Sequence, residues 1–287
     1  MILITIIIVL LIIVNINSIT INNNINVHSS NNVKSNEIMM WMCLERCDDN
    51  ASNITNQLNQ IEINKSSFKS ISFELYNLGP NSTLMLNNLT EVASSINAMG
   101  IETFAMVSSY PYPPEFIDYM RQVFEKPQPF IDSCIIAAKE NSLTGFNIDW
   151  EPVTDDVTPD DASNYATFLN TFALEMHKHG LRVSVDVGTW SAIWNLTAIS
   201  NTAVDQIITM NTYTNKKKTW IETFNNVIDI IPKDKLVIGL ESDIDLSDSD
   251  LILRFDELRL HNIKQIALWR SPVPVNWWPY INEYLKF

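Results

Sequence analysis

Glycine and histidine are scarce in this sequence, and each shortage excludes a kind of site. Only 6 of the 287 residues are glycine, and no glycine-rich loop follows any predicted strand. Dinucleotide-binding and P-loop sites need such loops so that the backbone can approach phosphate groups, and both are therefore excluded. The 4 histidines do not fall at the spacing of metal ligands. We expect no organic cofactor and no metal ion.

Positive charge and cysteine are also in short supply. The 19 Lys and Arg residues against 33 Asp and Glu residues give a net charge of −14, which repels phosphate backbones and argues against a nucleic-acid partner. The 3 cysteines are too few for a disulfide-dense scaffold. Hydrophobic residues make up 46% of the chain and charged residues 18%, which suits the core of one large domain or two small ones.

The amino-terminal residues are typical of a targeting segment. Residues 2–14 are almost wholly apolar, whereas a helix that spans a bilayer needs about 20 residues. We predict a signal peptide over residues 1–18. A buried strand or an uncleaved anchor is the alternative, because no basic residue follows Met1. Residues 19–36 are rich in Asn, Ser and Ile and are predicted to form a low-complexity connector. No other apolar run is long enough to cross a membrane, so we expect no stable membrane anchor after cleavage.

N-glycosylation sequons follow the connector. Together with a signal peptide they favour the secretory pathway, and hence a secreted or lysosomal protein. Cys43 and Cys47 are close enough in sequence to pair in an oxidising compartment, provided that a turn follows Cys43. Cys134 is expected to be a buried thiol on a helix. The sequon asparagines are Asn50, Asn53, Asn64, Asn81, Asn88 and Asn195.

Strand and helix patterns alternate along residues 37–287. The predicted strands are Met39–Cys43, Phe68–Tyr76, Ile101–Val107, Phe146–Trp150, Leu181–Val187, Gln206–Thr212, Leu236–Leu240 and Lys264–Trp269. Helical patterns cover residues 51–60, 86–99, 114–140, 159–179, 217–230 and 248–261. This alternation predicts an α/β fold with a single (β/α)8 TIM barrel over residues 37–287. A doubly wound open sheet is the main rival, and the lack of a glycine-rich loop argues against it.

In such a barrel, catalytic residues lie at the carboxyl ends of the strands. The residues expected there are acidic and aromatic, which suits a neutral ligand that is rich in hydroxyl groups and stacks on aromatic rings. They include Glu45, Glu74, Glu151, Asp186, Tyr213 and Trp269.

The fourth predicted strand has the most distinctive pattern. Because side chains alternate along a strand, Asn147, Asp149 and Glu151 share one face and the apolar residues between them share the other. Asp149 and Glu151 are expected to lie roughly 6–7 Å apart, close enough for one of them to stay protonated near neutral pH. A protonated carboxyl beside an ionised one is what cleavage of a glycosidic bond needs. The alternative is a half-exposed antiparallel strand with a polar outer face.

The stretch from Thr144 to Glu151 resembles the Asp-x-x-Asp-x-Asp-x-Glu signature of glycoside hydrolase family 18, the chitinases and chitobiases. Asp149 and Glu151 match the last two positions of the signature. Asn147 is a substitution that the family often shows, and Thr144 departs from the first position.

Two other strands add to the resemblance. The segment 208–214 is similar to the family's Met-x-Tyr-Asp/Asn segment, in which Tyr213 matches while Asn211 and Thr214 depart. Trp269 ends the eighth predicted strand, where the family keeps a tryptophan under the scissile sugar.

The resemblance implies a substrate-assisted retaining mechanism, in which the 2-acetamido group of the sugar attacks C1. It implies that Glu151 is the proton donor, that Asp149 orients the acetamide and that Tyr213 donates a hydrogen bond to the acetamide carbonyl. Trp269 is expected to stack under the sugar ring. The remaining candidates for substrate binding are Asn147, Glu45, Glu74, Asp186 and Asn211.

The sequence therefore predicts a monomeric glycoside hydrolase for short β-1,4-linked N-acetylglucosamine oligosaccharides. Asp149 and Glu151 favour turnover, whereas Thr144 and Thr214 favour the alternative of a catalytically weak or inactive chitinase-like lectin. A barrel hydrolase that acts on another glycoside is the third possibility.

Overall fold

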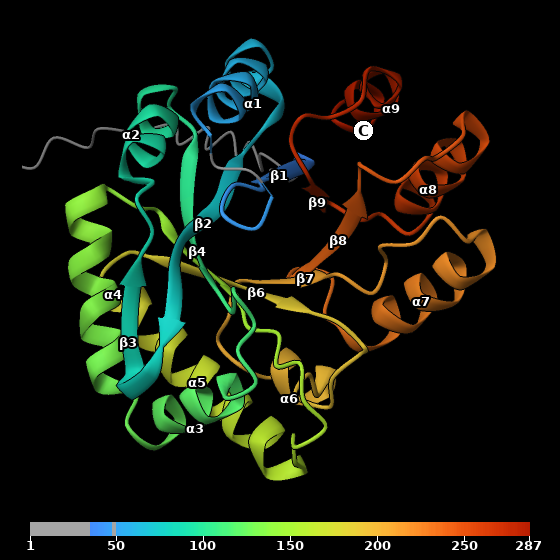
Figure 1. Cartoon of the computed structure of the whole chain (residues 1–287). Helices are drawn as coiled ribbons and strands as arrows, with labels where there is room; N and C mark the ends of the chain where they lie inside the picture. The colour runs from blue at the N-terminus through green and yellow to red at the C-terminus, as the bar shows by residue number, and fades with distance from the viewer. Residues whose placement is uncertain (1–34, 48–49) are drawn as a thin grey trace, which may run out of the picture. The chain divides into compact units, whose positions relative to one another are not determined.

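The computed structural model describes residues 35–47 and 50–287, and in this part of the chain eight parallel strands close into a barrel (Figure 1). Closure follows from β1, which pairs with β2 on one side and with β9 on the other. The predicted single (β/α)8 barrel is thereby confirmed. The barrel strands are β1 (Glu37–Met42), β2 (Ser70–Gly79), β4 (Glu102–Ser108), β5 (Gly145–Asp149), β6 (Arg182–Val187), β7 (Gln206–Thr209), β8 (Leu236–Glu241) and β9 (Gln265–Trp269).

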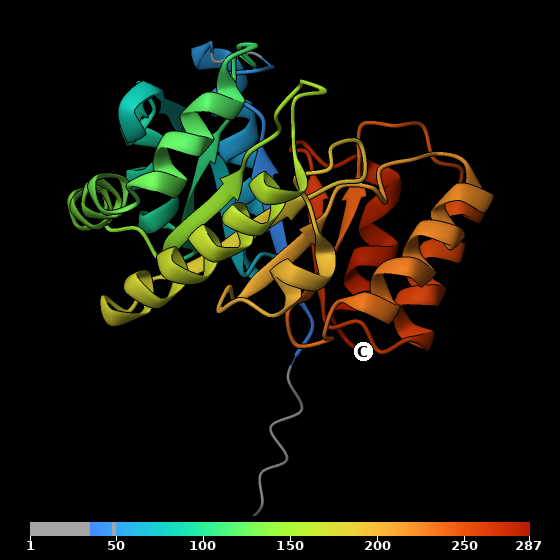
Figure 2. The same cartoon turned by 90° about the horizontal axis from the view of Figure 1, so that it is seen from below.

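Helices cover the outside of the barrel, as the views in Figures 1 and 2 show. All but the last lie between successive strands, so that the chain runs back along the outside of the barrel. The helices are α1 (Ala51–Ile63), α2 (Thr90–Ala98), α3 (Phe116–Glu125), α4 (Gln128–Asn141), α5 (Pro159–Lys178), α6 (Leu196–Ser200), α7 (Lys217–Ile230), α8 (Asp248–Leu260) and α9 (Trp278–Tyr284), the last of which follows β9.

Several predicted elements differ from the structure. The predicted helix 114–140 is two helices, α3 and α4, because Pro127 restricts the residue before it and Lys126 has a non-helical φ of −137° and ψ of 77°. The predicted helix 86–99 begins only at Thr90, and its expected start belongs to β3 (Thr83–Leu86), which pairs antiparallel with β2. The sixth predicted strand ends at Thr209, before the expected Thr212.

Side chains on the strands alternate between two apolar layers. Phe146, Ile148 and Trp150 point outward and join the core between strands and helices. Trp150 is fully buried, and its ring stacks on that of Phe168 at 5.1 Å between centroids. A smaller cluster that includes Trp41 packs inside the barrel. The predicted alternation of the fourth strand is therefore confirmed, with its apolar face outward and its polar face inward.

The amino-terminal predictions fall mostly outside the described residues. The predicted signal peptide (1–18) lies there entirely, together with residues 19–34 of the predicted connector. Asn36, the last residue of that connector, is buried and donates from Nδ2 to the carbonyl oxygen of Tyr284 at 2.6 Å. Among helices within the described ranges, none has the length and apolarity that a membrane crossing requires.

Candidate active site

A cavity of about 290 Å³ opens at the carboxyl ends of the barrel strands. Five predicted site residues from four different strands or the segments that follow them meet on its wall. The structure thus brings together Asp149, Glu151, Asp186, Tyr213 and Trp269. The full lining is Trp41, Arg46, Met106, Tyr112, Asp149, Glu151, Asp186, Trp190, Met210, Tyr213 and Trp269.

Asp149 and Glu151 form the acidic centre of the cavity. Asp149 is the last residue of β5, and its side chain is 3% exposed; that of Glu151, two positions further on, is 14% exposed. Burial raises the pKa of Glu151 to about 8, and the negative charge of Asp149 adds to the effect against the opposing influence of Arg46. Glu151 therefore holds a proton at neutral pH, which is the state that a general acid needs.

Three buried polar atoms of cavity-lining residues lack a hydrogen-bond partner among the described residues. They are Oδ1 of Asp149, an acceptor, the hydroxyl of Tyr213, a donor, and Nε of Arg46, which lies in an ion pair with Glu74. Tyr213 follows β7 through a turn in which its N–H donates to the carbonyl of Met210 at 2.9 Å. Gly239 leaves room for the ring, because a Cβ there would lie 2.8 Å from it and 2.1 Å from the Thr209 carbonyl oxygen.

Asn147 connects the centres of β1, β5 and β6 beneath the cavity. It is fully buried, accepts from Nε1 of Trp41 at 3.4 Å, and donates from Nδ2 to Ser184 Oγ and Asp186 Oδ1, each at 3.0 Å. Burial, with the charge of Asp149 second, raises the pKa of Asp186 well above its ordinary value. Asn147 thus does not line the cavity itself, and it orients the Asp186 carboxyl.

Aromatic rings form the apolar part of the wall. Trp269 ends β9, and its ring makes an edge contact with that of Trp41 at 5.8 Å between centroids. Trp190, on the segment after β6, is 54% exposed at the cavity and contacts Trp194 edge to face. These rings offer faces on which a sugar can stack.

Arg46 is a cavity residue that the sequence did not predict. Its Nη2 lies 2.6 Å from Asp149 Oδ2 and 2.8 Å from Ser108 Oγ, and its Nη1 lies 3.4 Å from Glu151 Oε1 and 2.7 Å from the Tyr112 hydroxyl. Burial on its own lowers the pKa of Arg46, but the charges of Asp149, Glu74 and Tyr112 and the hydrogen bond to Asp149 together raise it overall. Tyr112 was also missed, since the loop after β4 has no strand periodicity to place it.

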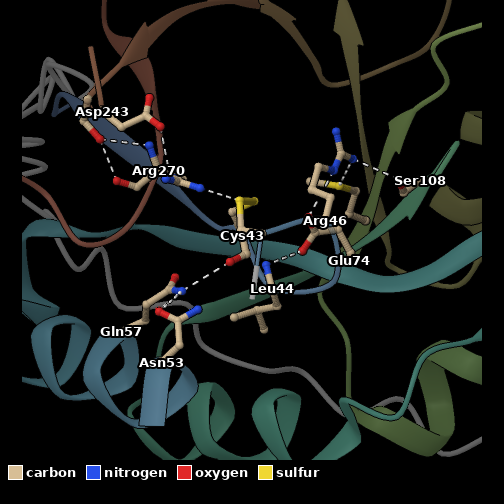
Figure 3. Close-up of a disulfide and its surroundings, with 12 residues drawn as sticks. Cys43, Leu44, Arg46, Asn53, Gln57, Glu74, Ser108, Asp243 and Arg270 are labelled. Atoms are coloured by element: carbon tan, nitrogen blue, oxygen red, sulfur yellow. Dashed lines mark hydrogen bonds and ion pairs between the residues drawn. A yellow bond between two sulfur atoms is a disulfide. The ribbon is translucent and has the colours of Figure 1, made fainter. Parts of the chain in front are cut away.

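The segment that presents Arg46 is closed by a disulfide between Cys43 and Cys47, whose Cα atoms are 5.5 Å apart. The turn that this pairing requires is present, with the Cys47 N–H donating to the Leu44 carbonyl at 3.2 Å. Figure 3 shows Arg46 beside Glu74 on one side of Cys43 and Arg270 with Asp243 on the other. Cys134 is the expected buried free thiol, on α4.

Other predicted site residues lie away from the cavity wall. Glu45 accepts hydrogen bonds from Asn77 and Asn87 at 2.8–2.9 Å. Glu74 is fully buried and contacts Arg46 instead of the cavity. Asn211 does not line the cavity either.

Thr144 precedes β5 at the opposite end of the strand from Glu151. Its hydroxyl accepts from the Thr103 N–H at 3.2 Å, so it supports the barrel wall rather than the acidic centre. Within residues 35–47 and 50–287, no three His, Cys, Asp or Glu side chains are arranged to hold a metal ion.

No family model matches the chain, and no curated protein matches its sequence. Solved structures match its fold. A chitinase from Chromobacterium violaceum superposes with a TM-score of 0.71 at 13% identity, over 88% of this chain and 100% of that one. The GH18 chitinase ChiB from Flavobacterium johnsoniae gives 0.65 at 14% identity, over 88% and 94%. A class V chitinase from Nicotiana tobaccum in complex with NAG4 gives 0.67 at 13%, over 88% and 98%. The resemblance to glycoside hydrolase family 18 is therefore confirmed for the fold, which is that of the family's chitinases.

Proposed function

We propose that this protein is a glycoside hydrolase that cleaves β-1,4-linked N-acetylglucosamine oligosaccharides by a substrate-assisted, retaining mechanism. The observation that supports this most strongly is the pair of unpartnered polar atoms, Asp149 Oδ1 and the Tyr213 hydroxyl, on the wall of one cavity. Buried polar atoms without partners cost free energy, so a ligand that satisfies both is favoured. A secondary amide, with one N–H donor and one carbonyl acceptor, complements this pair.

The 2-acetamido group of N-acetylglucosamine is such an amide. Its N–H would donate to Asp149 Oδ1, and its carbonyl oxygen would accept from Tyr213. The same carbonyl oxygen lies within reach of C1 of its own sugar, which makes it the internal nucleophile of the reaction.

Glu151 acts as the acid in the first step of the reaction and as the base in the second. Protonated Glu151 gives its proton to the glycosidic oxygen, the bond between C1 and that oxygen breaks, and the acetamide oxygen bonds to C1. The resulting oxazolinium cation is stabilised by the nearby carboxyl group of Asp149. Glu151, now ionised, takes a proton from a water molecule that attacks C1. The bond between C1 and the acetamide oxygen breaks, which opens the oxazolinium ring and leaves the configuration at C1 retained.

The size of the cavity and its rim support a short substrate. About 290 Å³ lies at the lower limit of small-molecule pockets, enough for roughly one sugar, and the exposed Trp190 extends the aromatic surface beyond it. The tobacco chitinase bound to NAG4 supports N-acetylglucosamine oligosaccharide as the ligand class.

Passage through the secretory pathway is part of the same proposal. The disulfide between Cys43 and Cys47 is of the kind that persists in oxidising compartments. Four of the sequon asparagines are exposed: Asn50, Asn81, Asn88 and Asn195. Glycopeptide mapping of protein made in a eukaryotic host tests this, and a chain that carries no glycan at any of the exposed sequons would contradict it.

The direct test of the activity is release of 4-methylumbelliferone from N-acetylglucosaminyl, chitobiosyl and chitotriosyl glycosides across about pH 4 to 9. Glu151→Gln should lower kcat by at least about a thousandfold, while Glu241→Gln is the matched control. Glu241 also ends a strand, and burial raises its pKa to about 6, but it lies off the cavity wall.

The outcomes separate the alternatives. Activity that disappears only in Glu151→Gln, with the β-anomer formed first, would establish the retaining mechanism. Binding of chito-oligosaccharides without hydrolysis would identify a lectin instead, and hydrolysis of glycosides that lack the acetamide would indicate a different glycosidase.

A further inference from the structure

Arg46 makes contacts at the acidic centre for which the proposed mechanism has no need. Its guanidinium touches both carboxyls, at 2.6 Å from Asp149 and 3.4 Å from Glu151. The Arg46 side chain is 13% exposed, so these charges are only weakly screened by water. One cation is thus shared by two carboxyls, and Asp149 has the closer contact.

The position of Arg46 is fixed from behind. Its Nε lies 3.1 Å from Glu74 Oε1, and Glu74 Oε2 accepts the N–H of Leu44 at 2.8 Å. Glu74 therefore holds both the guanidinium and the backbone of the segment that bears it. The disulfide between Cys43 and Cys47 closes that segment into a short loop (Figure 3). A side chain anchored in this way is pre-organised, so its contacts with the two carboxyls cost little further ordering.

The contacts of Asp149 have a consequence for its free oxygen. Oδ2 is bound to Arg46, while Oδ1 has no partner in the described part of the chain. Because the carboxyl group is planar, a fixed Oδ2 fixes the direction of Oδ1.

We propose that Arg46 is a positioning residue of this glycosidase: it binds Oδ2 of Asp149 so that Oδ1 is directed at the acetamide, and it places its positive charge beside Glu151. The inference rests on the proposed function. The alternative role is that the Arg46 guanidinium occupies the space in which the sugar would bind and so blocks the site. The guanidinium lies over the Trp269 ring, with Cζ 5.5 Å from the ring centroid, and both side chains border the cavity of about 290 Å³, so the experiment below has to separate the two roles.

The charged groups around the pair agree with this role. Asp149, Arg46 and Tyr112 are the groups that act on Glu151, and Asp149, Glu74 and Tyr112 are those that act most on Arg46. Burial and Asp149 raise the pKa of Glu151 more than Arg46 lowers it, so the proton stays at neutral pH with the cation in place.

The test compares two substitutions. Arg46→Gln removes the positive charge, whereas Arg46→Lys keeps the charge but lacks the planar guanidinium that can contact both carboxyls at once. With the chitobiosyl substrate, Arg46→Gln should lower kcat at least about tenfold and change KM less than about threefold. The basic limb of the kcat/KM profile should move to higher pH, because the cation that lowers the pKa of Glu151 is gone. In Arg46→Lys, both kcat and the pH of the basic limb should lie between those of Arg46→Gln and the wild type.

Arg121→Gln is the matched control, since Arg121 pairs with Asp161 at 2.9 Å, off the cavity wall. It should leave the pH profile unchanged. A rise of kcat/KM in Arg46→Gln would overturn the inference in favour of a blocking guanidinium. A fall in kcat with an unmoved pH profile would also overturn it, because a purely structural loss has no reason to shift the titration.

A second readout does not depend on hydrolysis. In protein labelled with ¹³C at glutamate carboxyls, the titration of Glu151 should move to higher pH in Arg46→Gln. An unmoved titration overturns the inference whatever the activity. An inactive wild type with a moved titration rejects the proposed function and still supports the control of the carboxyl pair by Arg46.

Discussion

Replacing Asp149 by Asn should move the pH dependence of the reaction to lower pH. The basic limb of kcat/KM reports the loss of the proton from Glu151 in the free protein. Burial raises the pKa of Glu151 to about 8, and the negative charge of Asp149 is the second cause. Removing that charge lowers the pKa. Arg46, released from its 2.6 Å contact with Asp149, then acts on Glu151 in the same direction.

The size of the shift follows from the strand geometry. Residues two apart on a strand are separated by roughly 7 Å, and two unit charges at that distance interact by about 2.4 kcal/mol at an effective dielectric constant of about 20. That energy corresponds to a displacement of about 1.7 pH units. The loss of acetamide orientation should also lower the maximal kcat/KM, but the pH at which the basic limb falls does not depend on that maximum.

The assay is hydrolysis of the chitobiosyl fluorogenic glycoside from about pH 4 to about pH 9.5 for the wild type and Asp149→Asn. Asp243→Asn, which removes a carboxylate outside the cavity lining, is the control and should keep the wild-type limb. If the limb of Asp149→Asn stays within about 0.5 pH units of the wild type, the electrostatic coupling between Asp149 and Glu151 is refuted.

Three further predictions concern stability and binding. Burial raises the pKa of Glu151 from 4.5 to about 8, so the free energy of unfolding should fall by up to a few kcal/mol as the pH rises through that window. The melting temperature should therefore be higher near pH 5 than near pH 9. Glu151→Gln should remove much of that difference. Replacing Cys43 and Cys47 by serine opens a loop with a sequence separation of 4 and should cost about 2 kcal/mol in urea unfolding; an unchanged midpoint would show that the loop is held by its other contacts. Trp269→Ala should raise KM at least about tenfold with Trp269→Phe in between, and equal KM values would remove Trp269 from the sugar site.

The fold and the acidic centre could be predicted because both depend on local periodicity. Polar residues at alternate positions of a strand that is otherwise apolar identify an inward face that meets a cavity, and this placed Asn147, Asp149 and Glu151 correctly on one side. The split of the predicted helix 114–140 at Pro127 was also accessible from sequence, because the residue before a proline avoids the helical region.

Arg46 could not be placed in the same way. It follows β1 within an irregular turn, where the period-two rule of the strand no longer applies, and its neighbour Glu45 was taken as the inward residue instead. The turn exists because Cys43 and Cys47 pair, and the sequence left that pairing open. Glu74 shows the complementary limit: its acidity suggested a contact with substrate, whereas the structure gives it the role of holding Arg46.

The charge balance of the cavity favours Glu151, rather than another carboxyl, as the proposed proton donor. Four carboxyls lie around the guanidinium of Arg46: those of Glu74, Asp149, Glu151 and Asp186. One positive charge cannot balance four buried negative ones, so protons must remain on some of them. Burial raises the pKa of Asp186 as well as that of Glu151, but Asp186 is 1% exposed and bonded to Asn147. Glu151, with 14% of its side chain exposed at the cavity, is the carboxyl whose proton is accessible to a ligand there.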